Sequence, residues 1–417
     1  MREQSGWTAA HLAAVAEWQL GALCGFEPDR RPGCDGNRAA TAHAANVFDA
    51  SGWEVSRPQF ETMDWRTDGG SISVGGTTVE LTPSPYGLGV STAGPIRIAR
   101  RPDDLQRSDL AGAILVLTDE LATEPFTPKA FPFYAHEHHA AIVRRLEESA
   151  PAAVLGITGK YPALCGALDP YPLVEDGDFL VPAASLRPGD AAPILAADGE
   201  DARIELRSQR WRARAENVIA TRGDQQRRVT VVAHIDTKPG TPGAVDNAAG
   251  VVVLLLLAEM LSPEHHRELP VGVELLAVNG EDHFAAPGEL DWLAANGDRL
   301  HEVALVVNID GAGYRGARSA YSMYNVAGDL AERVARSFGT VESVVPGPDW
   351  YQSDHAIFAM RGHPAVAITT ELVDEMLETL FHAPTDTPDR VDVELLVDVA
   401  RAIAALVTTW TPGAVRP

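Results

Sequence analysis

The sequence has little cysteine. Three cysteines, Cys24, Cys34 and Cys165, occur in 417 residues, and none belongs to a Cys-x-x-Cys pair. This content argues against a disulfide framework and against a thiolate zinc site. Buried free thiols are the favoured prediction, and a Cys24–Cys34 disulfide is the alternative.

Positive charge is also scarce. Lys and Arg number 34 against 58 Asp and Glu, which gives a formal net charge of -24. Such a field repels nucleic-acid phosphates and anionic lipid, so we expect neither nucleic acid nor a membrane surface as a partner. The same charge suits a site that concentrates cations.

Long hydrophobic runs and a leader-like N-terminus are absent from this sequence. The longest apolar run, residues 251–258, is far shorter than the ~20 residues that span a bilayer. Residues 1–26 mix Leu12, Leu20 and Leu23 with polar residues, which is typical of an amphipathic helix and not of a signal peptide. The sequence as given predicts a cytoplasmic protein.

The length predicts two or three folding units. Pro83 to Gly89 is rich in proline and glycine and marks a boundary. We therefore divide the chain into residues 1–84, 85–208 and 209–417. The middle segment contains two short apolar strands around a helix and predicts a small α/β or β-rich domain inserted into the larger one.

Strands and helices alternate after residue 218. This alternation predicts an α/β fold with a doubly wound, mixed and mostly parallel sheet, and in such sheets ligands bind at the carboxyl ends of the strands. The predicted strands are 229–233, 271–278, 303–309 and 365–369, and the predicted helices are 247–261, 289–295, 328–338 and 393–410.

Metal-binding residue types follow these strands or stand in nearby loops. Taken singly, each is an ordinary helix cap or loop acid, but together they converge on one sheet edge. Imidazole and carboxylate ligands without thiolate suit zinc, with manganese or cobalt as alternatives. A two-metal site needs one bridging carboxylate and terminal ligands on each ion. The residues are His234, Asp236, Asp246, Glu281, Asp282, Asp310 and His382.

At these residues the sequence resembles the M28 family of zinc aminopeptidases. The resemblance covers about residues 210–410, and its motifs occur in the order of the family. Residues 1–84 look like the N-terminal part of the catalytic domain, and residues 85–208 look like a protease-associated insert. The matching stretches are His234-Ile-Asp236, Asp246-Asn247, Glu281-Asp282, Asn308-Ile-Asp310 and His382, with support from Ser353 to Phe358.

The resemblance implies two zinc ions per chain. Asp246 would bridge them. His234 and Asp310 would complete one site, and Asp282 and His382 would complete the other.

It also implies roles for the two remaining acids. Glu281 would be the general base, taking a proton from water and passing it to the leaving amine. Asp236 would hold the ring of His234 and fix its tautomer.

Two residues depart from the family pattern. Asp282 stands where many members have Glu, so its metal contact is expected to differ. Phe381 stands where several members have Tyr, which leaves Tyr314, Tyr351 or the metals to stabilise the oxyanion.

Three functions are compatible with these residues. The leading prediction is a di-zinc metallohydrolase that cleaves a peptide or small amide, as an aminopeptidase or a small-molecule amidase. A mono-zinc glutaminyl cyclase is the alternative, but those relatives dispense with the first His, which is present here as His234. A binding module without activity is the third, although every site residue is intact. The sequence has no Gly-x-Ser-x-Gly elbow of a serine hydrolase. An oligomer through the inserted domain is also an expectation.

Other histidines are given structural interpretations. His136, His138 and His139 stand at a predicted helix start, where solvated or structural roles are favoured over metal binding. His355 is interpreted as a wall of the site, and His283 either contacts the ligands from behind or has no role.

Overall fold

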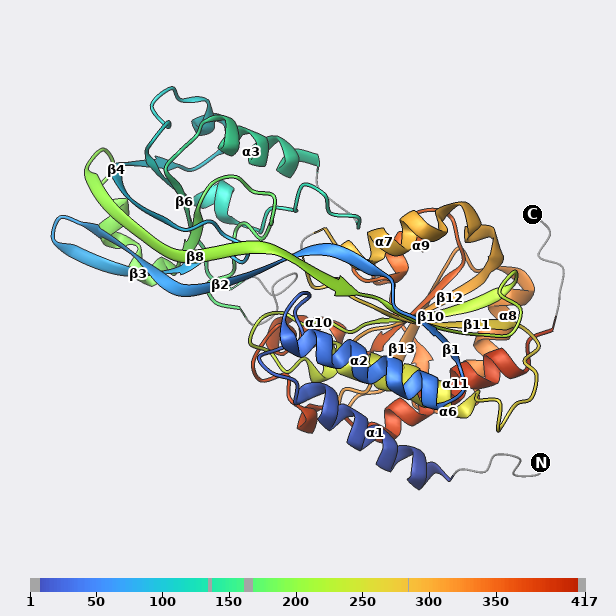
Figure 1. The fold of residues 1–417 in the computed structure, drawn as a ribbon. Helices are drawn as coiled ribbons and strands as arrows, with labels where there is room; N and C mark the ends of the chain where they lie inside the picture. The colour runs from blue at the N-terminus through green and yellow to red at the C-terminus, as the bar shows by residue number, and fades with distance from the viewer. Residues whose placement is uncertain (1–7, 134–136, 161–167, 284, 412–417) are drawn as a thin grey trace. The chain divides into compact units, whose positions relative to one another are not determined.

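A computed structural model describes residues 8–133, 137–160, 168–283 and 285–411. It contains two compact units (Figure 1). The main unit comprises residues 1–61, 214–376 and 381–417, and the second unit comprises residues 62–213 and 377–380. Each unit is described separately below.

The main unit is built on an eight-stranded sheet with the order β1-β9-β11-β10-β12-β15-β13-β14. The central strands β10, β11, β12 and β15 run parallel. Strand β9 is antiparallel to both of its neighbours, whereas β13 is antiparallel to β15 and parallel to β14. The predicted mixed, mostly parallel sheet is confirmed. The strands are β1 (Glu54–Ser56), β9 (Val218–Arg222), β10 (Arg228–His234), β11 (Gly272–Val278), β12 (Val303–Ile309), β13 (Ser319–Tyr324), β14 (Val344–Pro346) and β15 (Ala365–Thr370).

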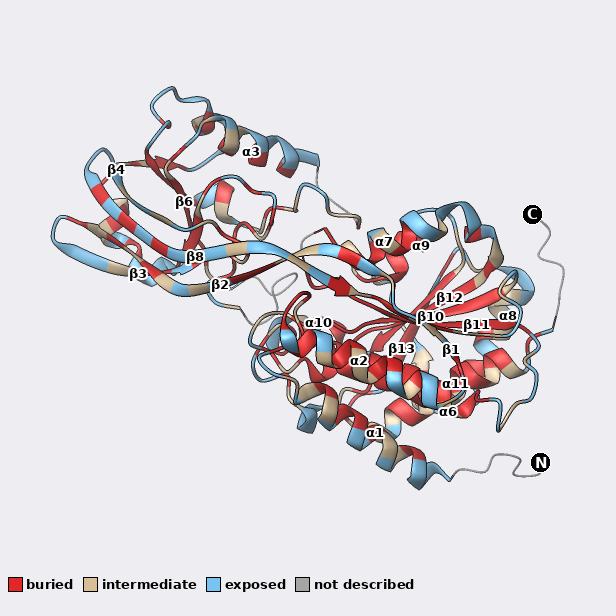
Figure 2. Cartoon of the chain, in the orientation of Figure 1, coloured by how far each residue is buried: buried red, intermediate tan, exposed pale blue. Residues whose placement is uncertain are grey.

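Helices cover both faces of this sheet. Every residue of β10 and β11 is buried, which explains why most of their residues are apolar (Figure 2). Helices α1 (Ala9–Cys24), α2 (Asp35–Ala50), α6 (Ala249–Met260) and α11 (Val393–Thr408) lie on one face, and α7 (Pro287–Asn296) and α9 (His355–Ala359) lie on the other (Figure 1). Helix α8 (Gly328–Phe338) packs against α11, and α10 (Val373–Thr379) precedes His382.

Helix α6 is apolar on all sides because it is enclosed by the sheet and by α1, α2 and α11. It begins later than the predicted residue 247. A single wide turn, Ala244–Ala248, precedes it and carries Asp246 and Asn247 with non-helical backbone angles. The turn therefore presents Asp246 at the carboxyl edge of the sheet instead of winding it into the helix.

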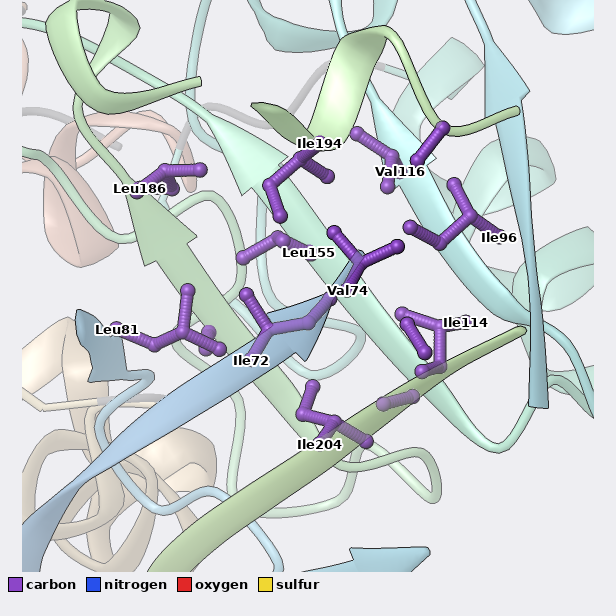
Figure 3. Packing of buried hydrophobic residues seen from close by; sticks show 14 of the residues in the cluster. Ile72, Val74, Leu81, Ile96, Ile114, Val116, Leu155, Leu186, Ile194 and Ile204 are labelled. Carbon is purple, nitrogen blue, oxygen red and sulfur yellow. The ribbon is translucent and has the colours of Figure 1, made fainter. Parts of the chain in front are cut away.

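The second unit is a closed barrel with the strand order β2-β3-β7-β6-β5-β4-β8. Its interior is filled by aliphatic side chains such as Ile72, Ile96 and Leu155, all fully buried (Figure 3). The elements are β2 (Gln59–Val74), β3 (Thr77–Pro83), β4 (Val90–Ala99), β5 (Ile114–Leu117), β6 (Ala153–Ile157), β7 (Ala183–Leu186), β8 (Asp201–Glu216), α3 (Glu137–Glu148) and α5 (Ala192–Leu195).

The boundaries of this unit differ from the predicted 85–208. The structure begins the unit at Thr62 and ends its main part at Ala213. Pro83 to Gly89 does not separate domains; it lies between β3 and β4 of the same barrel. The missed strand, β2, is long and only partly buried, so its apolar positions are too widely mixed with polar ones to stand out.

Two other sequence expectations concern cysteine and membrane spans. Cys24 and Cys34 are free thiols, so the alternative Cys24–Cys34 disulfide is wrong; Cys165 lies outside the described residues. The described part of the chain has no helix both long and apolar enough to cross a membrane.

Candidate metal centre

The seven predicted site residues lie in the main unit, and their strands bring them to one edge of its sheet. His234 is the last residue of β10, and Asp310 follows β12 directly. Because β10 pairs in parallel with both β11 and β12, the loops after these strands meet at the same edge. Glu281 and Asp282 are in the loop after β11.

Asp246 lies between two histidines. Its Oδ1 is 3.1 Å from His234 Nε2, and its Oδ2 is 3.4 Å from His382 Nε2. Asp310 Oδ1 is 3.5 Å from His234 Nε2, and Asp282 Oδ1 is 3.0 Å from His382 Nε2. The five predicted ligands therefore form two groups that share Asp246, which is the arrangement a pair of bridged metal ions requires.

The two acids of the Glu281-Asp282 pair face different histidines. Glu281 Oε2 is 3.9 Å from His234 Nε2, whereas Asp282 contacts His382. In each of the groups His234, Glu281, Asp310 and Asp246, Asp282, His382, one nitrogen or oxygen per residue lies within 4.8 Å of the others. The side chain of Asp282 is shorter than the Glu that many family members have at this position, but it still contacts His382.

The electrostatics of the site call for added positive charge. Burial raises the pKa of Asp246 and, with the neighbouring carboxylates, raises that of Glu281 well above its usual range. Burial would also raise the pKa of Asp282, but the charge and hydrogen bond of His382 lower it. Several carboxyl groups thus lie close to one another and to the imidazole rings of His234 and His382.

Several buried atoms at this edge have no hydrogen-bond partner among the described residues. They include both ring nitrogens of His234, Oδ1 of Asp310, Oδ2 of Asp282 and Nδ1 of His382. Unpartnered buried polar atoms are rare in folded proteins. Nitrogen and oxygen donors left open in this way fit zinc.

Comparison with known proteins gives a family for the segment that carries these residues. The model of Peptidase family M28 matches residues 217–407. This segment is a peptidase family M28 domain. The chain is 25% identical over 294 residues to "Probable lipoprotein aminopeptidase LpqL" of Mycobacterium tuberculosis, a match that covers 67% of this chain and 54% of that protein. The chain therefore spans about half the length of that relative.

Solved structures share the fold of the whole chain. An aminopeptidase from Aneurinibacillus sp. strain AM-1 superposes with a TM-score of 0.73 at 18% identity, covering 94% of this chain and 92% of that one. BSAP, a zinc aminopeptidase from Bacillus subtilis, gives 0.71 at 17% identity and covers 97% of this chain and 95% of its own.

Asp236 of the M28 domain makes more contacts than the sequence predicts. Its Oδ1 lies 3.8 Å from His234 Nδ1, which is beyond hydrogen-bond distance, so the predicted hold on the ring is not among the described hydrogen bonds. The same carboxylate accepts hydrogen bonds from the amides of Gly280 at 2.5 Å and Asp282 at 3.1 Å. Burial raises its pKa to about 7. Asp236 therefore ties the loop that carries Glu281 and Asp282 to the end of β10.

Two residues that support the M28 site were not assigned roles from the sequence. Asp386 accepts hydrogen bonds from the amides of Val245 at 2.8 Å and Asp246 at 3.0 Å. Ser353 donates to Asp310 Oδ2 at 2.8 Å. Ser353 stands in a stretch that supports the family resemblance, and Asp386 stands four residues after His382 in the family-like stretch His382-Ala-Pro-Thr-Asp386-Thr. These positions were the only available signal, because the partners of both residues are far away in the sequence.

His355 is placed behind the ligands. Asn308 donates its amide to His355 Nδ1 at 3.2 Å, so the neutral ring carries its proton on Nε2 and donates to the Trp350 carbonyl at 2.6 Å. Burial lowers the pKa of His355 to about 4, which keeps the ring neutral. His283 Nε2 lies 3.3 Å from the Thr237 carbonyl and 3.8 Å from Asp236 Oδ2.

The two tyrosines suggested for the oxyanion differ in their surroundings. Tyr351 is exposed and donates its hydroxyl to Asp349 at 3.0 Å. Tyr314 forms a backbone bridge with Val391.

Another group of metal-capable residues lies in the second unit and consists of Glu124, His138 and His139. The Thr127 amide donates to His139 Nδ1 at 3.2 Å, which leaves the proton of the neutral ring on Nε2, 3.3 Å from Glu124 Oε1. These hydrogen bonds give His139 a structural role. His136 lies outside the described residues.

Removing bound metal should destabilise the M28 domain, because several buried carboxylates would then repel one another. A ligand that binds only the folded state at 1,000 times its Kd adds about 4 kcal/mol to the free energy of unfolding. We expect a chelator to lower the melting temperature in calorimetry and zinc to restore it. The Asp246→Asn variant serves as the control and should respond little. An identical melting temperature with and without chelator would contradict a metal centre at these residues.

Proposed function

We propose that the chain is a di-zinc aminopeptidase, which hydrolyses the peptide bond after a free N-terminal residue. The observation that carries this proposal is the position of Asp246, with one carboxylate oxygen toward His234 and the other toward His382. A mono-zinc cyclase would need only one of these two ligand groups, and it would leave the intact His234 without a metal to bind.

Five residues would hold the metals. His234 and Asp310 would bind one ion, Asp282 and His382 the other, and Asp246 both. When bound, zinc supplies Lewis acidity that polarises the scissile carbonyl and makes water more acidic.

Glu281 is the proposed general base. In the group of His234, Glu281 and Asp310, the Glu281 oxygen lies 3.9 Å from His234 Nε2, farther than the Asp310 oxygen at 3.5 Å. Burial raises its affinity for a proton, since the charged carboxylate loses solvation. Glu281 would accept the proton of the attacking water and donate it to the departing amine.

The other residues hold this arrangement in place. Asp236 fixes the loop of Glu281 by accepting the Gly280 amide, and Ser353 holds Oδ2 of Asp310 by donating its hydroxyl. Such supporting contacts commonly change metal affinity or activity by 10–100-fold.

The substrate class is tested by blocking the α-amine. We expect aminoacyl-p-nitroanilides and short peptides to be hydrolysed, and their N-acetylated counterparts to be cleaved at least ~100-fold more slowly. Mass spectrometry of the products from a peptide with N-terminal Gln distinguishes the alternatives, because hydrolysis releases glutamine whereas cyclisation releases ammonia. Equal cleavage of free and blocked substrates would favour a general amidase, and cyclisation alone would contradict the proposal.

A further inference from the structure

Arg30 is a charged residue whose side chain is buried. The residue lies between α1 and α2, and only 2% of its surface is exposed. A buried guanidinium costs free energy unless its N–H groups find acceptors. Arg30 donates from Nε to the Ile235 carbonyl at 2.8 Å, and from Nη1 to those of Pro242 at 2.6 Å and Leu23 at 3.1 Å. It also donates from Nη2 to Gly243 at 2.9 Å.

Three of these four carbonyls belong to one loop. Ile235 directly follows the ligand His234, and Gly243 stands three residues before the ligand Asp246. The backbone amide of Arg30 also donates to Thr237 Oγ1 at 3.2 Å, within the same loop. A single side chain is therefore bonded to both ends of the segment that joins two ligands.

The loop turns sharply where Arg30 holds it. Gly243 has a φ of +55°, and a Cβ there would lie 2.4 Å from the Asp246 carbonyl oxygen and 3.1 Å from Arg30 Nη2. Only glycine allows the chain to turn this tightly against both groups. The bonded carbonyl of Gly243 thus leads straight into the turn that presents Asp246.

Asp386 also binds the segment between His234 and Asp246, but through its backbone amides. Asp386 accepts the amide protons of Val245 and Asp246, and the Thr241 hydroxyl donates to the Ala383 carbonyl at 2.9 Å, next to His382. Arg30 therefore binds carbonyls of this segment while Asp386 binds amides. Hydrogen bonds to a charged group are the stronger kind.

We propose that Arg30 is a positioning residue for the metal centre, which fixes the distance between His234 and Asp246 before metal binds. This inference rests on the proposed di-zinc function. A loop that is already ordered loses less conformational freedom on binding than a loose one, so its ligands bind metal more tightly.

A matched control is available in the same unit. Arg222 also donates its guanidinium to backbone carbonyls, those of Leu261, His266 and Arg267. It pairs with Val273 at the start of β11, at the edge of the sheet opposite to the metal ligands. Replacing Arg222 removes the same kind of contact without touching the loop between His234 and Asp246.

The test compares Arg30→Lys with Arg222→Lys in the full chain. Zinc affinity is measured on metal-depleted protein by competition with a chelator of known affinity, and melting temperatures are recorded in parallel. We expect both variants to melt earlier, but only Arg30→Lys to bind zinc more weakly, by about 10–100-fold. Turnover of Arg30→Lys should recover as zinc is raised. Wild-type zinc affinity in Arg30→Lys, or equal losses in the two variants, would overturn the inference.

A milder change keeps the test valid if Arg30→Lys does not fold. Thr237→Val removes the acceptor of the Arg30 amide and keeps the shape of the side chain, so we expect a loss of zinc affinity of about 2–10-fold, as for one hydrogen bond. An unchanged affinity in Thr237→Val would then overturn the inference. Wild-type chain that binds no zinc would instead contradict the proposed function itself.

Discussion

Glu281→Gln is expected to lower turnover by about 10²–10⁴-fold, the usual contribution of general acid–base catalysis, while the chain keeps its fold and its zinc. The amide retains the size of the side chain but cannot accept a proton from water. Adjacent side chains in an extended or tightly turned backbone point in different directions, and here Glu281 faces His234 while Asp282 faces His382. The proposed base, Glu281, and the proposed metal ligand, Asp282, therefore face different parts of the site.

Asp282→Asn is the matched comparison, since it makes the same chemical change one residue later. It should reduce zinc content because an amide is a weaker ligand than a carboxylate. Steady-state kinetics and metal analysis of the two variants decide the assignment. Normal turnover in Glu281→Gln, or loss of zinc from Glu281→Gln but not from Asp282→Asn, would require the two roles to be exchanged or abandoned.

The second large effect is expected for Asp246→Asn. Asp246 is 5% exposed and lies within 3.4 Å of both histidines, so its replacement weakens both metal groups at once. A bound metal stabilises the transition state by several kcal/mol, and each 1.36 kcal/mol is a factor of ten in rate. We therefore expect activity to fall by at least about 10³-fold.

Zinc content separates this effect from that of a terminal ligand. Asp246→Asn should lose more than one zinc per chain, whereas Asp282→Asn should lose at most one. The two amide variants have the same change of charge, so the difference reports position alone. A variant Asp246→Asn that retains full zinc and full activity would exclude a bridging role.

The ligands could be predicted from the sequence because their signals are local. Each of His234, Glu281-Asp282 and Asp310 follows an apolar strand, and parallel strands bring their carboxyl ends together whatever the details of packing. Asp246 could be placed at the start of a helix by the apolar run after it. The exact turn could not, because its wide shape depends on partners elsewhere, including the Ile309 carbonyl that accepts from Asn247 at 2.8 Å.

The supporting residues were not predictable in the same way. Arg30 stands more than 200 residues before the loop that it holds, and Asp386 stands about 140 residues after Asp246. Nothing in the neighbourhood of either residue identifies these partners. A small α/β or β-rich domain was predicted for this part of the chain, but its closure into a barrel was not, because β4 and β8 pair across more than 100 residues and their alternation is interrupted by partly buried polar positions.

Anomalous diffraction from zinc-loaded crystals, measured at the zinc absorption edge, shows directly whether the chain binds two ions across Asp246. We expect two anomalous peaks about 3.5–4 Å apart, one on each side of the Asp246 carboxylate. The first should lie beside His234 and Asp310, and the second beside Asp282 and His382. A single peak at full zinc supply, or peaks away from Asp246, would contradict the di-zinc aminopeptidase.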